Sequence, residues 1–215
     1  GVWNSAEEIA ANPHFSDDAP GGIRIVDTNN DGSLTPEDRV ALGTPYPDFT
    51  WGITNTFQIK DFDISFLIQG VQGITVLNGD VYYNETKKWN KKYTKNRWVS
   101  AEHPGDGKTP YQNVKTGHDL MLTDYPLQNA SYACLRNFTV GYTLPATAAR
   151  KIKLSGVRFY VSGSNLLYIW GSGYKGINPE SRMTSGNYSS AMISGYQRGG
   201  FPLTSTISAG FDINF

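Results

Sequence analysis

The sequence predicts an all-β protein in which five antiparallel strands cross a membrane as one part of an outer-membrane β-barrel. Three observations support this fold class: five segments alternate apolar and polar residues, the connections between them differ greatly in length, and the last segment ends in Phe215. Its alternation covers residues 204–215. That span exceeds the roughly five or six residues of a soluble strand and approaches the roughly 9–11 residues of a tilted membrane strand.

The first two predicted strands cover residues 49–59 and 62–70. Along the first, apolar residues such as Trp51 and Phe57 occupy all odd positions but one, and threonines, Gly52 and Gln58 occupy the even ones. The second places phenylalanines and isoleucines on its even positions. Lys60 and Asp61 alone separate the two strands, which predicts a tight antiparallel hairpin.

The third and fourth predicted strands cover residues 131–144 and 156–165, and the fifth covers residues 204–215. In the third strand, Phe138, Val140 and Tyr142 share a face. Arg136 has the same parity as these apolar residues, so we expect a bulge or a change of register near Asn137.

The connections predict which side of the membrane each one occupies. Short connections follow the first and third strands, whereas residues 71–130 and 166–203 form long ones. Short periplasmic turns and long extracellular loops are typical of bacterial outer-membrane barrels. We therefore divide the chain into an extracellular segment, residues 1–48, and a segment of barrel strands and loops, residues 49–215.

Five strands are too few for a closed membrane barrel, since the smallest have about eight. An open sheet edge in lipid leaves backbone groups unpaired, so the remaining strands of the barrel must come from elsewhere. We therefore expect this chain to be the carboxy-terminal part of a longer protein.

Composition argues against several other classes of protein. Lys and Arg together number 19, as do Asp and Glu, so there is no basic excess for nucleic-acid binding. The single cysteine, Cys134, excludes an intramolecular disulfide. The three histidines lack paired metal-ligand spacing, and no nucleophile elbow or phosphate loop occurs, so we expect no enzymatic activity.

Residues 27–38 match a twelve-residue calcium loop, with Gly32 at the position that requires a sharp turn. Two departures from the helix–loop–helix pattern are present: an Asp replaces the usual Glu at the last position, and an apolar, strand-like run precedes the loop. We expect a structural Ca²⁺, with an Asx-rich turn that holds no metal as the alternative. The predicted ligands are Asp27, Asn29, Asp31, the Ser33 carbonyl and Asp38.

Several segments together resemble the carboxy-terminal third of SusC/RagA-type TonB-dependent transporters. The resemblance covers most of residues 21–215. The segments that carry it are Ile23–Asp27, Asp31–Gly32, Asp38–Arg39, Leu42–Phe49, Asp61–Ser65, Gln69–Gly70, Leu135–Pro145 and Ser162–Leu166.

The resemblance implies a 22-stranded barrel with an amino-terminal plug, which these 215 residues lack. It implies import of glycans or peptides, driven through TonB and assisted by a SusD-like lipoprotein lid. The expected partners are therefore the rest of the barrel, the lid, TonB, outer-membrane lipid and the solute. By the same resemblance, the terminal residues Phe211, Ile213 and Phe215 would form the signal for barrel assembly.

Aromatic residues in the long loops are the candidates for solute contact, because aromatic faces suit both sugar rings and peptide side chains. These candidates are Trp89, Tyr93, Trp98, Tyr174, Tyr188 and Tyr196. The alternative function is a soluble, secreted β-sandwich that is stabilised by calcium and binds carbohydrate. The unequal connections and the aromatic terminal strand argue against that alternative.

Overall fold

The computed structural model describes residues 1–81, 95–111, 123–171, 173–181, 195–197 and 200–215. The chain divides into two compact units. One unit is formed by residues 46–74, 130–180 and 201–215, and the other by residues 1–45, 75–129 and 181–200. The long connections group with the amino-terminal residues in one unit, and the division into an extracellular segment 1–48 and a barrel segment 49–215 stays a prediction. Within the described ranges, no helix is long and apolar enough to cross a membrane.

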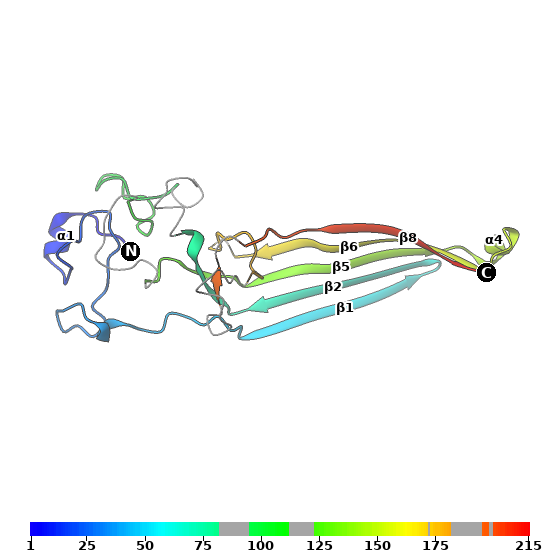
Figure 1. Ribbon diagram of the computed structural model, residues 1–215, viewed down its shortest axis with the longest axis horizontal. Helices are drawn as coiled ribbons and strands as arrows, with labels where there is room; N and C mark the ends of the chain where they lie inside the picture. Colours follow the sequence, from blue (N-terminus) through cyan, green and yellow to red (C-terminus); the bar gives the residue numbers. More distant parts are fainter. Residues whose placement is uncertain (82–94, 112–122, 172, 182–194, 198–199) are drawn as a thin grey trace. The chain divides into compact units, whose positions relative to one another are not determined.

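A five-stranded antiparallel sheet, in the order β1-β2-β5-β6-β8, dominates the first of these units (Figure 1). The predicted antiparallel sheet of five strands is confirmed, and the fold is mostly β, with short helices beside the strands. The sheet is open, because β1 and β8 are its edges and do not pair with each other. Its strands are β1 (Phe49–Ile59), β2 (Phe62–Gln72), β5 (Tyr132–Thr143), β6 (Gly156–Trp170) and β8 (Thr206–Asn214).

The strand lengths suit the expected span. β1 and β2 contain 11 residues each, β5 contains 12 and β8 contains 9, against the roughly 9–11 that cross a bilayer. β1 begins and ends at the residues that the sequence predicts. β6, with 15 residues, continues five beyond its predicted end at residue 165.

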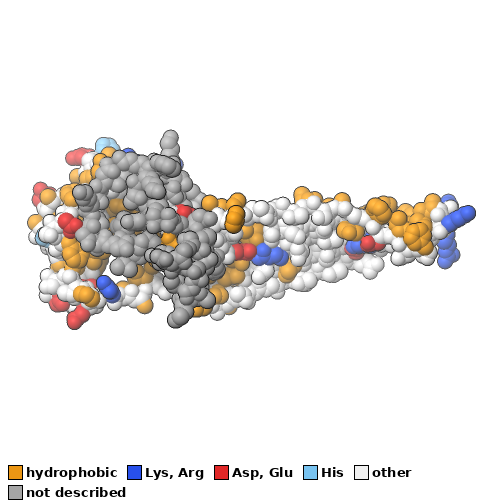
Figure 2. Space-filling model, in the orientation of Figure 1, with side chains coloured by type: hydrophobic (Ala, Val, Ile, Leu, Met, Phe, Trp, Pro, Cys, Tyr) orange, Lys and Arg blue, Asp and Glu red, His pale blue; other side chains and the backbone are white. Residues whose placement is uncertain are grey.

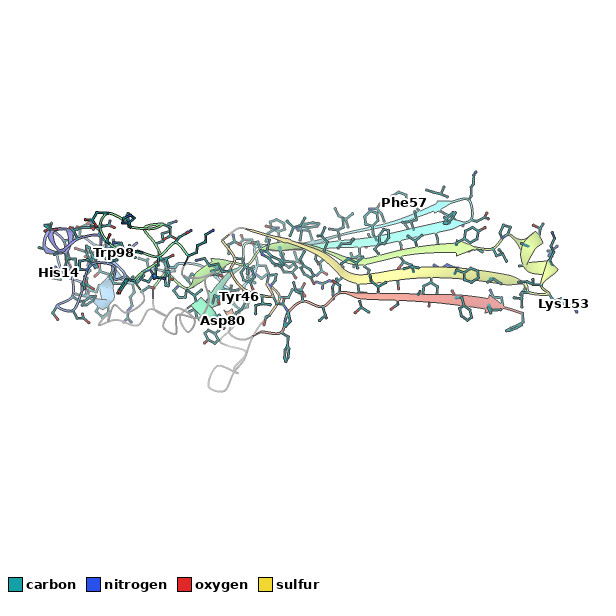
Figure 3. The ribbon with its side chains drawn as sticks, turned by 90° about the horizontal axis from the view of Figure 1, so that it is seen from above. His14, Tyr46, Phe57, Asp80, Trp98 and Lys153 are labelled. Atoms are coloured by element: carbon teal, nitrogen blue, oxygen red, sulfur yellow. The ribbon has the colours of Figure 1, made fainter. Side chains whose placement is uncertain are left out.

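Two connections, one tight turn and one short helix, join strands at the same end of this sheet. Lys60, with φ of 53°, begins the turn between β1 and β2, and the short helix α4 (Ala146–Lys151) connects β5 to β6. Figure 1 shows both connections and the carboxy terminus at the same end of the sheet. Figure 3 labels Phe57 on β1 and Lys153 in the turn that follows α4.

The second unit contains a small mixed sheet that the sequence did not reveal. β3 (Thr75–Asn78) pairs antiparallel with β4 (Leu127–Asn129) and parallel with β7 (Tyr196–Gln197). The helix α1 (Ala6–Ala10), capped by the Ser5 side chain, and the 3-10 helix η1 (Pro36–Asp38) also belong to this unit. Its buried apolar side chains include Val2, Trp3, Ile9, Ile23, Val76 and Val81.

Candidate functional site

The five-stranded sheet has one apolar face, and that face is exposed. Register places Ile53 beside Ile68, Phe66 beside Phe138, and Phe159 beside Phe211, so apolar side chains continue across all five strands. Twelve large apolar side chains of this face are 40–74% exposed: Phe49, Ile53, Phe57, Ile59, Phe62, Phe159, Val161, Leu167, Ile169, Ile207, Phe211 and Ile213. A continuous exposed apolar surface of this size marks a contact with lipid or with protein.

The opposite face is polar. It carries small hydroxyl residues in register, such as Ser65 beside Thr139 and Ser162 beside Ser208. Figure 2 shows few charged side chains over the strands on the face that it presents. Alternation of an apolar outer face with a polar inner face is the arrangement of membrane β-barrels.

A bulge directs the charge of Arg136 to the polar face. The pairing of β5 with β2 shifts between Leu67 and Ile68, and its pairing with β6 shifts between Leu135 and Asn137. The expected irregularity near Asn137 is therefore present. Because the bulge inverts the alternation at this point, Arg136 lies on the face opposite to that of Phe138.

Arg136 is the centre of a polar cluster that joins three strands and the segment after β6. Its Nε donates to Gln69 Oε1 at 3.2 Å, and its Nη1 donates to Asn165 Oδ1 at 2.8 Å and to the Tyr168 hydroxyl at 2.9 Å. Nη1 and Nη2 both contact the Glu180 carboxylate. The guanidinium also lies over the Tyr168 ring, 5.9 Å from its centroid.

Aromatic rings continue from this cluster along the same region of the sheet. The centroids of Tyr132 and Tyr168 are 6.0 Å apart, those of Tyr168 and Trp170 are 6.4 Å apart, and those of Trp170 and Tyr174 are 6.1 Å apart. Tyr174 is buried. The row therefore connects β5 and β6 to the segment that follows β6.

A second ionic cluster lies nearer the end of the sheet that carries the tight turns. Arg158 on β6 contacts Asp63 on β2 with Nη2–Oδ2 of 2.6 Å, and Asp212 on β8 with Nη1–Oδ2 of 3.3 Å. β5 lies between β2 and β6, and it presents Gly141 at this position. A Cβ on Gly141 would lie 2.4 Å from Asp63 and 2.5 Å from Arg158. The absence of a side chain at Gly141 therefore allows the two charged side chains to meet above β5.

The predicted calcium loop folds as a series of Asx turns. The Gly32 N–H donates to Asp27 Oδ2 at 2.8 Å, the Asp31 N–H donates to Asn29 Oδ1 at 3.0 Å, and the Ser33 N–H donates to Asp31 Oδ1 at 2.8 Å. Gly32 has φ of 84°, which a residue with a side chain adopts only with strain. This part of the loop has the turn that a calcium site requires.

Asp38 closes the loop through the backbone. Its Oδ1 accepts from the Thr28 N–H at 2.7 Å and its Oδ2 accepts from the Thr35 N–H at 2.8 Å. These hydrogen bonds, from Thr35 first and then Thr28, lower the pKa of the Asp38 carboxyl. Among the described residues, no three His, Cys, Asp or Glu side chains gather in a metal-binding group. Calcium binding by this loop stays a prediction.

The aromatic candidates for solute contact have different surroundings. Trp89, Tyr93 and Tyr188 lie outside the described residues. Tyr174 and Tyr196 are buried, with their hydroxyls close to Gly176 and Gly79 respectively. Trp98, labelled in Figure 3, is partly buried and has its ring 6.2 Å from that of Tyr111 in an edge-on contact. Solute contact by these residues stays a prediction.

The terminal aromatic residues lie on or next to the edge strand. Phe211 and Ile213 belong to the apolar face of β8, and Phe215 follows the strand and is 95% exposed. Their role in barrel assembly stays a prediction. Sequence reasoning missed Glu180 altogether, and the one signal toward its cluster was the unexpected parity of Arg136.

Comparison with known proteins identifies relatives of the whole chain. It is 30% identical over 225 residues to TonB-dependent receptor P26 of Formosa agariphila, covering 100% of this chain and 22% of the relative. TonB-dependent receptor P3 of the same organism is 30% identical over 93% of this chain. TonB-dependent receptor SusC of Bacteroides thetaiotaomicron is 27% identical over 73% of it. The chain thus spans 15–22% of the length of these relatives. No family model matches it.

Solved structures show the same fold. The RagAB peptide importer in its open-open state matches 95% of this chain with a TM-score of 0.63 and 19% identity. The structure of the RagAB peptide transporter matches 80% of this chain with a TM-score of 0.60 and 21% identity. In these comparisons the chain covers 20% and 18% of the respective solved chains. The five-stranded sheet therefore matches one part of a larger receptor.

Proposed function

We propose a transport function from one premise: this chain is homologous, over nearly its full length, to part of the SusC/RagA-type TonB-dependent receptors. These homologues are transporters and not enzymes. The proposed role is to form one part of the wall of an outer-membrane β-barrel that imports nutrients with energy delivered through TonB. The remaining strands and the plug belong to the rest of that protein.

The exposed apolar face is the observation that supports this role. Its twelve large side chains are about half exposed, and full burial of each one contributes about 1.5–3 kcal/mol. Covering the face with hydrocarbon would therefore gain on the order of 10–20 kcal/mol. That gain is comparable to the whole stability of a folded domain, about 5–15 kcal/mol. A soluble carbohydrate-binding sandwich would need a second sheet over this face, so we favour lipid.

The names of the matching structures support a proposal for the solute and the partners. Two of the matching structures carry the name RagAB and are described as a peptide transporter or importer. We propose that the full-length protein imports peptides or glycans together with a SusD-like surface lipoprotein. The polar face of the sheet, with its hydroxyl side chains, would then border the aqueous lumen.

Uptake and location together test this proposal. The full-length protein should fractionate with the outer membrane and should migrate faster on an unheated gel than on a heated one. Cells that express it should take up fluorescent oligopeptides or oligosaccharides, and loss of TonB should abolish this uptake. A protein that is released in soluble form and binds carbohydrate without detergent would instead support the secreted binding module.

A further inference from the structure

The segment Gly173–Glu180, which follows β6, packs against the polar face of the sheet, and its Tyr174 and Pro179 side chains are buried. Tyr174 packs against Trp170, and Asn178 Nδ2 donates to the Phe201 carbonyl at 3.2 Å. Asn178 Oδ1 also accepts from the Glu180 N–H at 2.9 Å, which fixes the backbone just before the carboxylate. The ion pair between Glu180 and Arg136 joins the segment to β5.

The strands hold Arg136 in place for this ion pair. Gln69 from β2 and both Asn165 and Tyr168 from β6 accept hydrogen bonds from its guanidinium. Asn165, with φ of 55°, sits where β6 contains an extra residue relative to β5, so the irregular region supplies both the arginine and one of its acceptors. Glu180 presents its carboxylate to this oriented guanidinium, and its Oε1 also accepts from the Tyr168 hydroxyl at 3.3 Å.

Partial burial gives this pair more weight than an ordinary surface ion pair. The side chains of Arg136 and Glu180 are 23% and 27% exposed. Contact through two guanidinium nitrogens is geometrically specific and stronger than a contact between neutral groups. Removal of one partner would leave the other charge partly buried and without its counter-ion, which is more costly than the net value of the pair.

We propose that Arg136 and Glu180 are positioning residues that form a latch, and that this latch holds the segment Gly173–Glu180 on the polar face of the sheet. The inference rests on the proposed function in one respect: if the polar face borders the lumen, the latched segment borders the path of the solute. Arg136 acts from the wall and Glu180 from the segment. Breaking the latch loosens the segment where Glu180 meets the sheet and leaves the sheet itself intact.

Hydrogen exchange measured by mass spectrometry tests the latch in the full-length protein purified in detergent. The variants are Arg136→Gln, Glu180→Gln and the double variant. Amide exchange in peptides from residues 173–180 should accelerate at least tenfold in each single variant, which corresponds to about 1.4 kcal/mol. The double variant should be no faster than the single variants, because all three lose the same contact.

The matched control is Arg158→Gln, which removes another arginine of the same polar face that pairs with carboxylates on other strands. This variant should leave exchange in residues 173–180 unchanged. The latch is refuted if both single variants exchange like the parent, or if their effects add in the double variant. It is also refuted if Glu180→Gln accelerates exchange throughout β2, β5 and β6, because the pair would then support the sheet itself.

Failure of the latch and failure of the proposed function give different results. The exchange experiment needs no transport and no lipid, so unchanged exchange overturns the latch alone. An unmodified protein that does not fractionate with the outer membrane overturns the barrel function, and leaves the latch as a feature of an isolated sheet.

Discussion

Placing a single charge on each face of β1 would reveal which face meets lipid. Ile53 lies near the middle of the strand, is 51% exposed and pairs with Ile68. Thr54, the next residue, points to the opposite face and pairs with Leu67. Ile53→Arg and Thr54→Arg therefore place the same charge at the same height on opposite faces of the wall.

The expected difference follows from burial and depth. An arginine on the lipid face near the bilayer midplane costs about 2–4 kcal/mol. The half-buried Ile53 side chain loses roughly 1 kcal/mol more, about half the value of full burial. Thr54→Arg, bordering water, should cost about 0–1 kcal/mol, as a surface substitution does. A difference of about 3 kcal/mol changes the folding equilibrium about a hundredfold.

The assay is a urea titration of the full-length protein in lipid vesicles, with the folded fraction read from migration on unheated gels. Ile53→Phe is the control that separates lipid from a packed protein core. Fluid lipid accommodates the larger ring, whereas overpacking a core costs about 1–3 kcal/mol. Equal destabilisation by the two arginine variants, or strong destabilisation by Ile53→Phe, would refute lipid contact at this face.

Four further predictions concern other parts of the chain. Asp31→Ala should lower calcium content and speed amide exchange in residues 21–48; equal calcium in parent and variant, by metal analysis, would remove the calcium assignment. Gly141→Ala should destabilise the full-length protein by about 1 kcal/mol, the value of a partly exposed ion pair, and should cost nothing further in an Arg158→Gln background, as urea titration would show. Phe215→Asp should reduce the amount of folded protein in the outer membrane, and an undiminished amount would exclude Phe215 from the assembly signal. Because the pKa of Asp38 is lowered, its hydrogen bonds should persist at neutral pH and fail only as the pH falls below the ordinary value of 3.8; amide exchange at Thr28 and Thr35 across that range would detect this loss.

The strands were predictable where most positions follow the local alternation. β1 follows its pattern from Phe49 to Ile59 and has the predicted bounds. The prediction stopped short in β6 because polar Asn165 and apolar Leu166 interrupt the alternation, and the apolar odd positions resume only at Leu167 and Ile169. A local interruption of the pattern with a period of two ended the predicted strand, although the strand itself continues.

Contacts between distant residues were not predictable in this way. Arg136 and Glu180 are 44 positions apart, and the sequence around either residue does not indicate the other as its partner. β7 has two residues and pairs with β3 far earlier in the chain, so neither length nor composition marks it as a strand. These features depend on the path that the long connections take through space, which the local preference of residues for helix, strand or turn does not determine.

The unpaired edges of β1 and β8 determine how this sequence would behave if it were expressed alone. Each edge presents a row of backbone donors and acceptors along an 11- or 9-residue strand that is flanked by apolar side chains. Such an edge is a template for the strands of other copies, and natural proteins avoid exposing one of this length. The isolated polypeptide should therefore form filaments or amorphous precipitate, and its solubility would report on intermolecular pairing instead of on the stability of the native wall.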